Sequence, residues 1–246
     1  MQIISLAPSN TEILYEIGSG DDIVATTSIC NHPEEATKKP GIGGWLNSDI
    51  DEIRAFEPDL VLASDDLQDE AVQKLEEEEF ETFQVRPHTV EEVFDSIIEI
   101  GEVVGRKSEA EELVEEMKEA IDGLDFNGSP SIYCEEWTDP PMASGNWIPG
   151  LIKKAGGEFF LEEGERSREF DLEELKEFDP ELIFLNVCGA GENVDRSEIL
   201  ERSDWQDLSA VKNGNVFVID DSLLNRPGPR LVDGIKKIVY LTNQNH

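Results

Sequence analysis

The sequence predicts an α/β protein made of two similar lobes, and three observations lead to this fold class. A chain of 246 residues, 38% of them hydrophobic, is long enough to bury one large core or two small ones. Short apolar runs typical of buried strands alternate along the chain with amphipathic segments typical of helices. Residues 53–64 (IRAFEPDLVLAS) and 175–186 (LKEFDPELIFLN) also repeat one pattern. Two copies of one helix-to-strand unit indicate two related lobes.

Each copy of this repeat predicts a helix that stops at a proline and leads into a buried strand. Pro58 and Pro180 lack a backbone N–H and disfavour helical geometry in the preceding residue, so each helix ends there. The apolar residues that follow do not alternate with polar ones, which indicates a strand covered on both faces. Ligands of two-lobed proteins usually bind in the cleft between the lobes, and we expect the site there.

The other elements follow from the same periodicities. In the N-terminal lobe, residues 1–88, we expect strands at 2–6, 22–27, 60–63 and 82–85 and helices at 10–17, 50–56 and 68–78. In the C-terminal lobe, residues 125–246, we expect strands at 131–135, 158–161, 182–186 and 216–219 and helices at 147–155, 172–178, 197–202 and 231–241.

Residues 89–124 are predicted to join the lobes as one long α-helix. Apolar side chains recur there at three- and four-residue steps, with Glu and Lys on the other face, as in an amphipathic helix of about thirty residues. Gly105 marks a bend in it. The predicted architecture is therefore two Rossmann-like α/β lobes and a single linking helix.

The charge of the chain is strongly acidic along its whole length. Lys and Arg number 20 against 56 Asp and Glu, which gives a net charge of −36. Such a surface is typical of proteins from salt-loving organisms, where molar salt screens the self-repulsion. It also repels nucleic acid and anionic membranes, so we expect neither as a partner, and we expect a monomer.

The cysteine content and the N-terminal sequence indicate the cellular compartment of the protein. Three scattered cysteines are too few for a disulfide framework. The chain opens directly on a predicted strand, with no basic segment, apolar signal run or lipid-anchor cysteine, and no run approaches membrane-spanning length. The sequence as written is thus expected to be cytoplasmic, with the cell surface as the alternative if a leader was removed.

Two loops after predicted strands carry candidate binding residues. Trp45 lies in the glycine-rich segment GIGGW and is either a lid on its own lobe or a flat wall for a ligand. The segment WTDPPMASGNW, residues 137–147, brackets two prolines with two indoles, and so suits recognition of a large planar ligand. The alternative is a helix-entry loop with Trp147 in the core.

Two further loops carry arginines and thiols. Residues 225–230 (NRPGPR) frame Arg226 and Arg230 with prolines and a glycine, which suits binding of a carboxylate, phosphate or amide, or else anchors the last helix. Cys30 with His32, and Cys188 in the other lobe, are weak candidates for a soft-metal site. Buried free cysteine is more often a small apolar filler.

Catalysis finds little support. The chain has no Gly-x-Ser-x-Gly elbow, phosphate-cradling loop or dinucleotide fingerprint. Pairs of acidic residues carry no information in so acidic a chain. We therefore expect no enzyme activity, and no intrinsic cofactor.

The opening IISLAPSNTE and the helix-ending PDLV resemble class III substrate-binding proteins, the group that serves cobalamin and iron-siderophore importers. Trp45 and the segment DPPMASG resemble the cobalamin-binding branch. EWTDPP, GNW, CG and RPGPR are similar to a leaderless subgroup that we expect to be haloarchaeal. His32 departs from the branch, which often has tyrosine there, and Asn146 departs from the subgroup, which often has histidine.

This resemblance implies two α/β lobes, a long linking helix and non-catalytic binding of a cobalamin-like corrinoid, in an ABC importer or as a cytoplasmic carrier. The implied ligand contacts are His32, Trp45, Trp137, Pro141, Asn146, Trp147, Asn225, Arg226 and Arg230. Asp51 and Glu198 are the implied acids for docking on a permease. The alternatives are ferric siderophore or haem on the same fold and, from another class, a two-lobed nucleotide-sugar enzyme.

Overall fold

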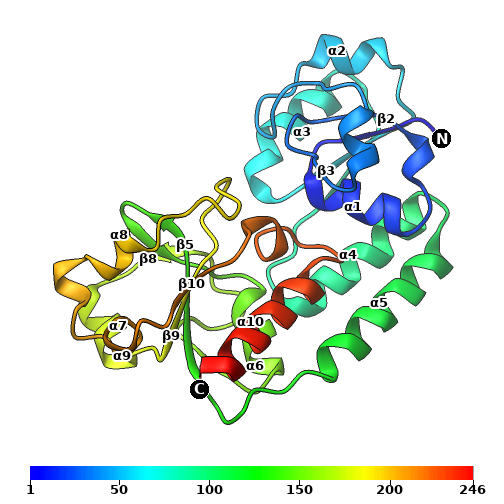
Figure 1. The fold of residues 1–246 in the computed structure, drawn as a ribbon. Helices are drawn as coiled ribbons and strands as arrows, with labels where there is room; N and C mark the ends of the chain where they lie inside the picture. The colour runs from blue at the N-terminus through cyan, green and yellow to red at the C-terminus, as the bar shows by residue number, and fades with distance from the viewer. Residues whose placement is uncertain (246) are drawn as a thin grey trace. The chain divides into compact units, whose positions relative to one another are not determined.

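The computed structural model describes residues 1–245 and divides them into two compact α/β units (Figure 1). One unit contains residues 1–87 and 91–116, and the other contains residues 88–90 and those from 117 onward. Each unit holds one β-sheet, so the predicted α/β class with two lobes is confirmed.

The sheet of the first unit has four parallel strands in the order β2-β1-β3-β4. Their bounds are β1 Ile3–Ser5, β2 Ile23–Thr26, β3 Leu60–Ser64 and β4 Thr82–Val85. Every residue of β1 and β3 is buried, as the apolar runs without alternation predicted. The carboxyl ends of all four strands lie at one edge of the sheet, where parallel sheets carry their ligand loops.

Three helices of the first unit accompany this sheet. They are α1 Pro8–Glu16, α2 Ile50–Ala55 and α3 Asp69–Glu77. Buried side chains of the strands and helices form one core, which includes Ile4, Ile42, Ile53, Val61 and Leu75. Ile42 lies in the glycine-rich segment, so that segment is fixed to the core at one point.

The prediction of a single linking helix is wrong, because the structure has two helices in its place. They are α4 Val90–Val103 and α5 Lys107–Asp122, drawn side by side in Figure 1. Gly105 takes a φ of +74° between them, which L side chains rarely adopt, and this ends the first helix. A Cβ on Gly101 would lie 2.4 Å from the Ala110 Cβ, so glycine allows the two helices to pack closely.

The sheet of the second unit is mixed. Four parallel strands, β5 Ser131–Thr138, β7 Glu158–Phe159, β9 Leu182–Leu185 and β10 Val216–Val218, pair in the order β7-β5-β9-β10. Two antiparallel strands, β6 Pro141–Ala143 and β8 Arg168–Glu169, extend it beside the second half of β5.

The β5–β6 hairpin was not predicted, because its two prolines indicated a loop. Pro141 is the first residue of β6, a position where a strand tolerates the missing N–H. The segment that begins with Trp137 is therefore a strand end and a turn rather than a free loop.

The helices of the second unit are α6 Ile148–Lys154, α7 Leu172–Phe178, α8 Ser197–Leu200, α9 Ser209–Asn213 and α10 Leu231–Asn245. No helix within residues 1–245 has both the length and the apolar character needed to cross a membrane.

The two units share one strand topology, which agrees with the internal sequence repeat. Taken in chain order, the parallel strands of each unit are arranged second-first-third-fourth across the sheet. Pro58 precedes the third strand of the first unit, and Pro180 precedes the third strand of the second. The acids before these prolines, Glu57 and Asp179, have φ of +46° and +44°. The repeated sequence thus encodes the same left-handed helix end in both units.

Candidate functional site

Each unit brings its candidate residues to loops at the carboxyl ends of its parallel strands. The first unit carries Trp45 and His32 in the connection that follows β2. The second carries Trp137 near the end of β5, Asn146 between β6 and α6, and Asn225 in the segment that follows β10.

Trp45 is half-buried in a loop that we call the Trp45 loop, residues 41–49. Backbone hydrogen bonds fix the base of this loop: Ile42 N donates to Thr26 O (3.0 Å) and Asp49 N to Ile42 O (3.2 Å). Gly43 takes a φ of +94°. A Cβ added to Gly43 would lie only 2.8 Å from the Asn47 carbonyl oxygen. Only glycine fits there, so the glycine-rich sequence encodes a tight turn that presents the indole.

His32 and Cys30 lie in the connection between β2 and the Trp45 loop. His32 is half-buried, whereas Cys30 is buried. The hydroxyl of Thr11 donates to the Cys30 sulfur, and the hydroxyl of Thr27 lies at the same 3.2 Å from it. These contacts make Cys30 a small packed side chain of the first unit.

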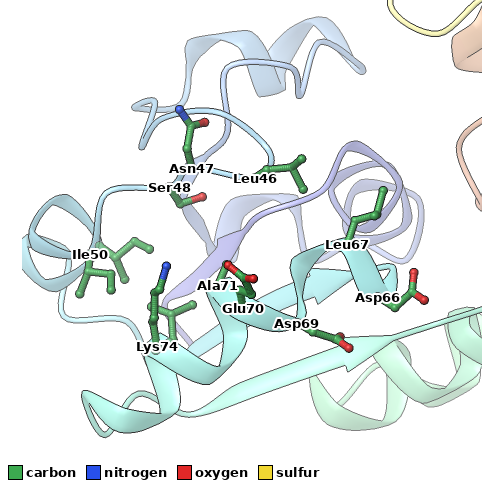
Figure 2. A pocket seen from close by; sticks show the side chains of 12 residues that line it. Leu46, Asn47, Ser48, Ile50, Asp66, Leu67, Asp69, Glu70, Ala71 and Lys74 are labelled. Carbon is green, nitrogen blue, oxygen red and sulfur yellow. The ribbon is translucent and has the colours of Figure 1, made fainter.

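A pocket of about 520 Å³ opens beside the Trp45 loop (Figure 2). Its floor includes the buried Ile53 and Leu75, and its rim includes Leu46 and Leu67, which are 55% and 61% exposed. Side chains from residues 46–50 form one wall, and side chains from Asp66 to Leu75 form the other. None of the residues predicted to bind ligand lines this pocket, although Leu46 directly follows Trp45.

A chain of polar contacts joins three loops of the second unit. Ser144 and Asn186 are fully buried, and the Asn186 amide donates to the Ser144 hydroxyl (3.0 Å) and to the Asn225 amide oxygen (2.6 Å). The Asn225 amide donates in turn to the Asn186 carbonyl (2.9 Å) and the Cys188 sulfur (3.0 Å). The structure therefore places the predicted Asn225 and Cys188 together.

The Cys188 residue lies at the surface, but its thiol has a raised pKa. Partial burial of its sulfur and the nearby carboxylate of Glu136 raise the pKa of Cys188 to about 11, so the thiol stays protonated at neutral pH. Within residues 1–245, no group of three or more His, Cys, Asp or Glu side chains is arranged to hold a metal ion.

Trp137 and Trp147, predicted to act alike, differ in the structure. Trp137 is 48% exposed, and its indole N–H donates to the Asp139 carbonyl (3.0 Å). Trp147 is only 6% exposed, and its N–H donates to the Leu224 carbonyl (2.8 Å). The expectation that Trp147 offers a flat wall to a ligand is wrong, because this indole packs in the core at the start of α6.

Asn146 and Pro141 flank the buried Ala143 and Ser144. Asn146 is half-buried with a φ of +56°, a left-handed conformation that asparagine tolerates. Its amide oxygen lies 3.2 Å from His88 Nδ1. No sequence signal indicates this contact, because His88 and Asn146 are 58 residues apart in the chain.

Arg226 and Arg230 lie beside an acidic residue. Arg230 donates to the Ser222 hydroxyl (3.2 Å). Burial opposes ionisation of Asp220, but hydrogen bonds from Ser222 and the charges of Arg230 and Arg226 outweigh it, so the pKa of Asp220 lies below its usual range. Part of the positive charge of this loop is therefore already balanced.

Asp51 and Glu198, the candidate docking acids, are both exposed in the first turn of a short helix, α2 and α8 respectively. The repeated topology, however, makes α7 and not α8 the counterpart of α2, since α2 and α7 each lead into the third strand. Glu173 in α7 stands where Asp51 stands in α2, seven residues before the proline, and its side chain is 82% exposed.

The residues that sequence reasoning missed are buried polar groups. Gln68 in the first unit and the Glu135–Arg202 pair in the second are almost enclosed and hydrogen-bonded. Periodicity assigns such positions to a helix or strand, but it does not show which backbone groups their side chains reach.

Comparison with known proteins gives one family. The family model described as "Periplasmic binding protein" matches residues 3–223. An uncharacterised ABC transporter substrate-binding lipoprotein, YvrC of Bacillus subtilis (strain 168), is 27% identical over 256 residues, covering 96% of this chain and 78% of that protein. The vitamin B12-binding protein of Vibrio cholerae serotype O1 is 24% identical over 245 residues, covering 96% and 87%.

Solved structures agree on the fold. The periplasmic vitamin B12-binding protein BtuF of Vibrio cholerae has a TM-score of 0.75 at 21% identity, with 99% of this chain and 97% of that one covered. The periplasmic heme-binding protein RhuT of Roseiflexus sp. RS-1 has a TM-score of 0.84 at 19% identity, with 99% and 98% covered. At these identities the likeness establishes the two-lobed fold.

Proposed function

Because this chain belongs to the periplasmic binding protein family, we propose that it is the solute-binding component of an ABC importer and that its solute is a cobalamin-like corrinoid. The observation that carries the choice of solute is the presence of an accessible indole in each unit. Trp45 is half-buried at the carboxyl end of one sheet, and Trp137 is 48% exposed at the end of β5 in the other. Flat aromatic walls suit a large planar ligand.

The polar residues around these indoles fit the rest of a corrinoid. Asn146 offers its amide to the amide side chains of the ring. Asn225, whose two N–H groups already donate within the unit, offers the second lone pair of its amide oxygen. Arg226 and Arg230 offer guanidinium groups to the nucleotide phosphate. His32 and Pro141, both half-buried, complete the proposed contacts. Trp147, buried in the core of the second unit, is proposed to hold the neighbouring contact residues in place. Such a protein binds its solute and carries out no catalysis.

Haem or a ferric siderophore is the second candidate. The structural likeness to a heme-binding protein supports this candidate. Haem is flat and a ferric siderophore is anionic, and the candidate residues include indoles and arginines. Strongly anionic ligands require a cluster of basic side chains, whereas Arg226 and Arg230 are partly balanced by Asp220. We therefore rank it below the corrinoid.

We expect cyanocobalamin and aquocobalamin to bind with roughly micromolar or tighter affinity in titration calorimetry at high salt. Trp45→Ala should weaken binding by about 1–3 kcal/mol, because an aromatic anchor at the centre of a site carries much of its energy. Tyr240→Ala is the control, since this 64% exposed tyrosine lies on α10 and outside the proposed contacts. If neither corrinoid releases heat or co-elutes with the protein, the corrinoid assignment is wrong, and haem and ferric siderophores are the next ligands to titrate.

Docking on the permease tests the importer part of the proposal. Charge reversal at both Asp51 and Glu173 should reduce binding to membranes that contain the cognate permease, because exposed acids on equivalent helices present charge to basic partners. Solute affinity should not change. Glu198→Lys separates the two assignments of the second acid: a loss with Glu198→Lys but not with Glu173→Lys would favour Glu198.

A further inference from the structure

Gln68 is a buried amide that joins three backbone segments of the first unit. It is 0% exposed and lies just before α3. Its amide nitrogen donates to the carbonyl of Trp45 (2.7 Å) and to the carbonyl of Leu6 (3.1 Å). Its amide oxygen accepts from the N–H of Ser64 (2.8 Å). Leu6 follows β1 and Ser64 ends β3, so one side chain connects the Trp45 loop to the ends of two central strands.

The chemistry of these three contacts requires an amide. Two partners are carbonyl oxygens and need a donor, whereas the third is an N–H and needs an acceptor. Only one orientation of the Gln68 amide satisfies all three, so the network also fixes which atom is nitrogen. A carboxylate lacks the donors, and an apolar side chain lacks both.

The contact to Trp45 joins the tip of the Trp45 loop to Gln68, and within the tip the Ser48 hydroxyl also donates to the Gly44 carbonyl (3.1 Å). The base is held by backbone hydrogen bonds of Ile42 and Asp49, and by a bridge between Gly43 and Ser48. At the tip, the carbonyl of Trp45 accepts from Gln68. The bond links two segments next to the pocket of Figure 2, since Trp45 directly precedes the lining residue Leu46 and Gln68 lies between the lining residues Leu67 and Asp69.

We propose that Gln68 is a positioning residue for Trp45: its amide holds the Trp45 loop in the conformation that presents the indole to solute. The proposal rests on the proposed function, because it assigns Trp45 a part in solute binding. Holding an anchor in its bound conformation improves affinity by lowering the conformational entropy lost on binding.

The first experiment is hydrogen exchange on the free protein, read by mass spectrometry. Gln68→Met keeps a side chain of similar length without donor or acceptor, and should speed exchange of the Ile42 and Asp49 amides in the Trp45 loop. Gln84→Met is the matched control. The Gln84 amide also donates to a backbone carbonyl of the same unit, that of Asp65 (2.6 Å), but it does not contact the Trp45 loop. Unchanged exchange of residues 41–49 in Gln68→Met, or equal acceleration in both variants, would overturn the proposal.

The second experiment is a double-mutant cycle on solute affinity, with cyanocobalamin as the probe. Gln68→Met should raise the Kd about tenfold, and Gln84→Met should leave it unchanged. In the Trp45→Ala background, Gln68→Met should have almost no further effect, because its action passes through the indole. Additive effects would mean that Gln68 acts on folding alone and would contradict the positioning role.

The two experiments separate this proposal from the proposed function. If wild-type protein does not bind cyanocobalamin, the corrinoid assignment fails, and the cycle is repeated with the haem or ferric siderophore that does bind. The exchange measurement needs no ligand, so it decides whether Gln68 orders the Trp45 loop whichever solute is correct.

Discussion

Replacing Arg202 by methionine should lower the free energy of unfolding by about 3–5 kcal/mol, because it leaves a buried carboxylate without its charged partner. Glu135 is 0% exposed, and the guanidinium of Arg202 contacts both of its carboxylate oxygens at 2.8 and 2.9 Å. Arg202 also donates to the Thr138 carbonyl (2.7 Å) and lies over the Trp205 ring, 4.4 Å from its centroid. The variant loses a bidentate ion pair, a hydrogen bond and a stacked contact together.

Denaturant unfolding at high salt measures this effect. Arg106→Met is the control, because its pair with Glu109 is exposed on α5 and its loss should change stability little. Adding Glu135→Gln to Arg202→Met should restore part of the stability, since no charge is then left buried. A loss in Arg202→Met no larger than that in the control would show that the pair does not stabilise the fold.

The pH dependence of Arg202→Met gives a second readout. Burial raises the pKa of Glu135, and hydrogen bonding and charge from Arg202 oppose that rise. Without Arg202 the folded-state pKa should rise further above the unfolded value. A group with a raised pKa in the folded state contributes stability at low pH and loses it as pH rises through that pKa. The deficit of the variant relative to wild type should therefore shrink as pH falls toward the ordinary glutamate range.

Thermal melts should shift strongly to higher temperature between dilute buffer and molar KCl. With a net charge of −36, self-repulsion opposes the compact state, and the Debye length falls from about 10 Å at 0.1 M salt to about 3 Å at 1 M. We expect the protein to be loosened or unfolded at low salt and restored by KCl. Equal midpoints at low and high salt would remove the argument for a salt-adapted protein.

Glu115→Lys separates charge screening from other effects of salt. Glu111 and Glu115 are exposed four residues apart on α5, an arrangement in which like charges repel. The substitution converts this pair to opposite charges, so it should raise the melting midpoint at low salt and have little effect in molar KCl. A gain of the same size at both salt concentrations would indicate a local packing effect instead.

The sequence predicted most of the regular elements because each depends on local periodicity. The strand at 82–85 and the helix at 172–178 match β4 and α7, and both prolines of the repeat end their helices as expected. The prediction of one linking helix was wrong because amphipathic periodicity is the same in one long helix and in a pair of helices. Only the left-handed Gly105 and the close packing of Gly101 on Ala110 distinguish the two.

Prediction from local sequence has the same limit for the loops of the candidate site. Trp137 and Trp147 have equivalent sequence settings, yet one indole is half-exposed and the other is buried, because exposure depends on which segments pack over each ring. The glycine-rich sequence around Trp45 predicted a loop, because the backbone freedom of glycine is a local property. Its anchor on Gln68, 23 residues away, depends on the fold.

The sequence by itself determined the α/β class, the two repeated units, the acidic character and the loop that carries Trp45. These properties follow from backbone sterics, side-chain period and composition, all of which act over a few residues. Only the tertiary structure decided which polar side chains are buried and what they hold: Gln68 on the Trp45 loop, Asn186 on Asn225, and Arg202 on Glu135. Their partners are distant in the chain, and a buried polar group is stable only where the complete fold supplies its hydrogen bonds.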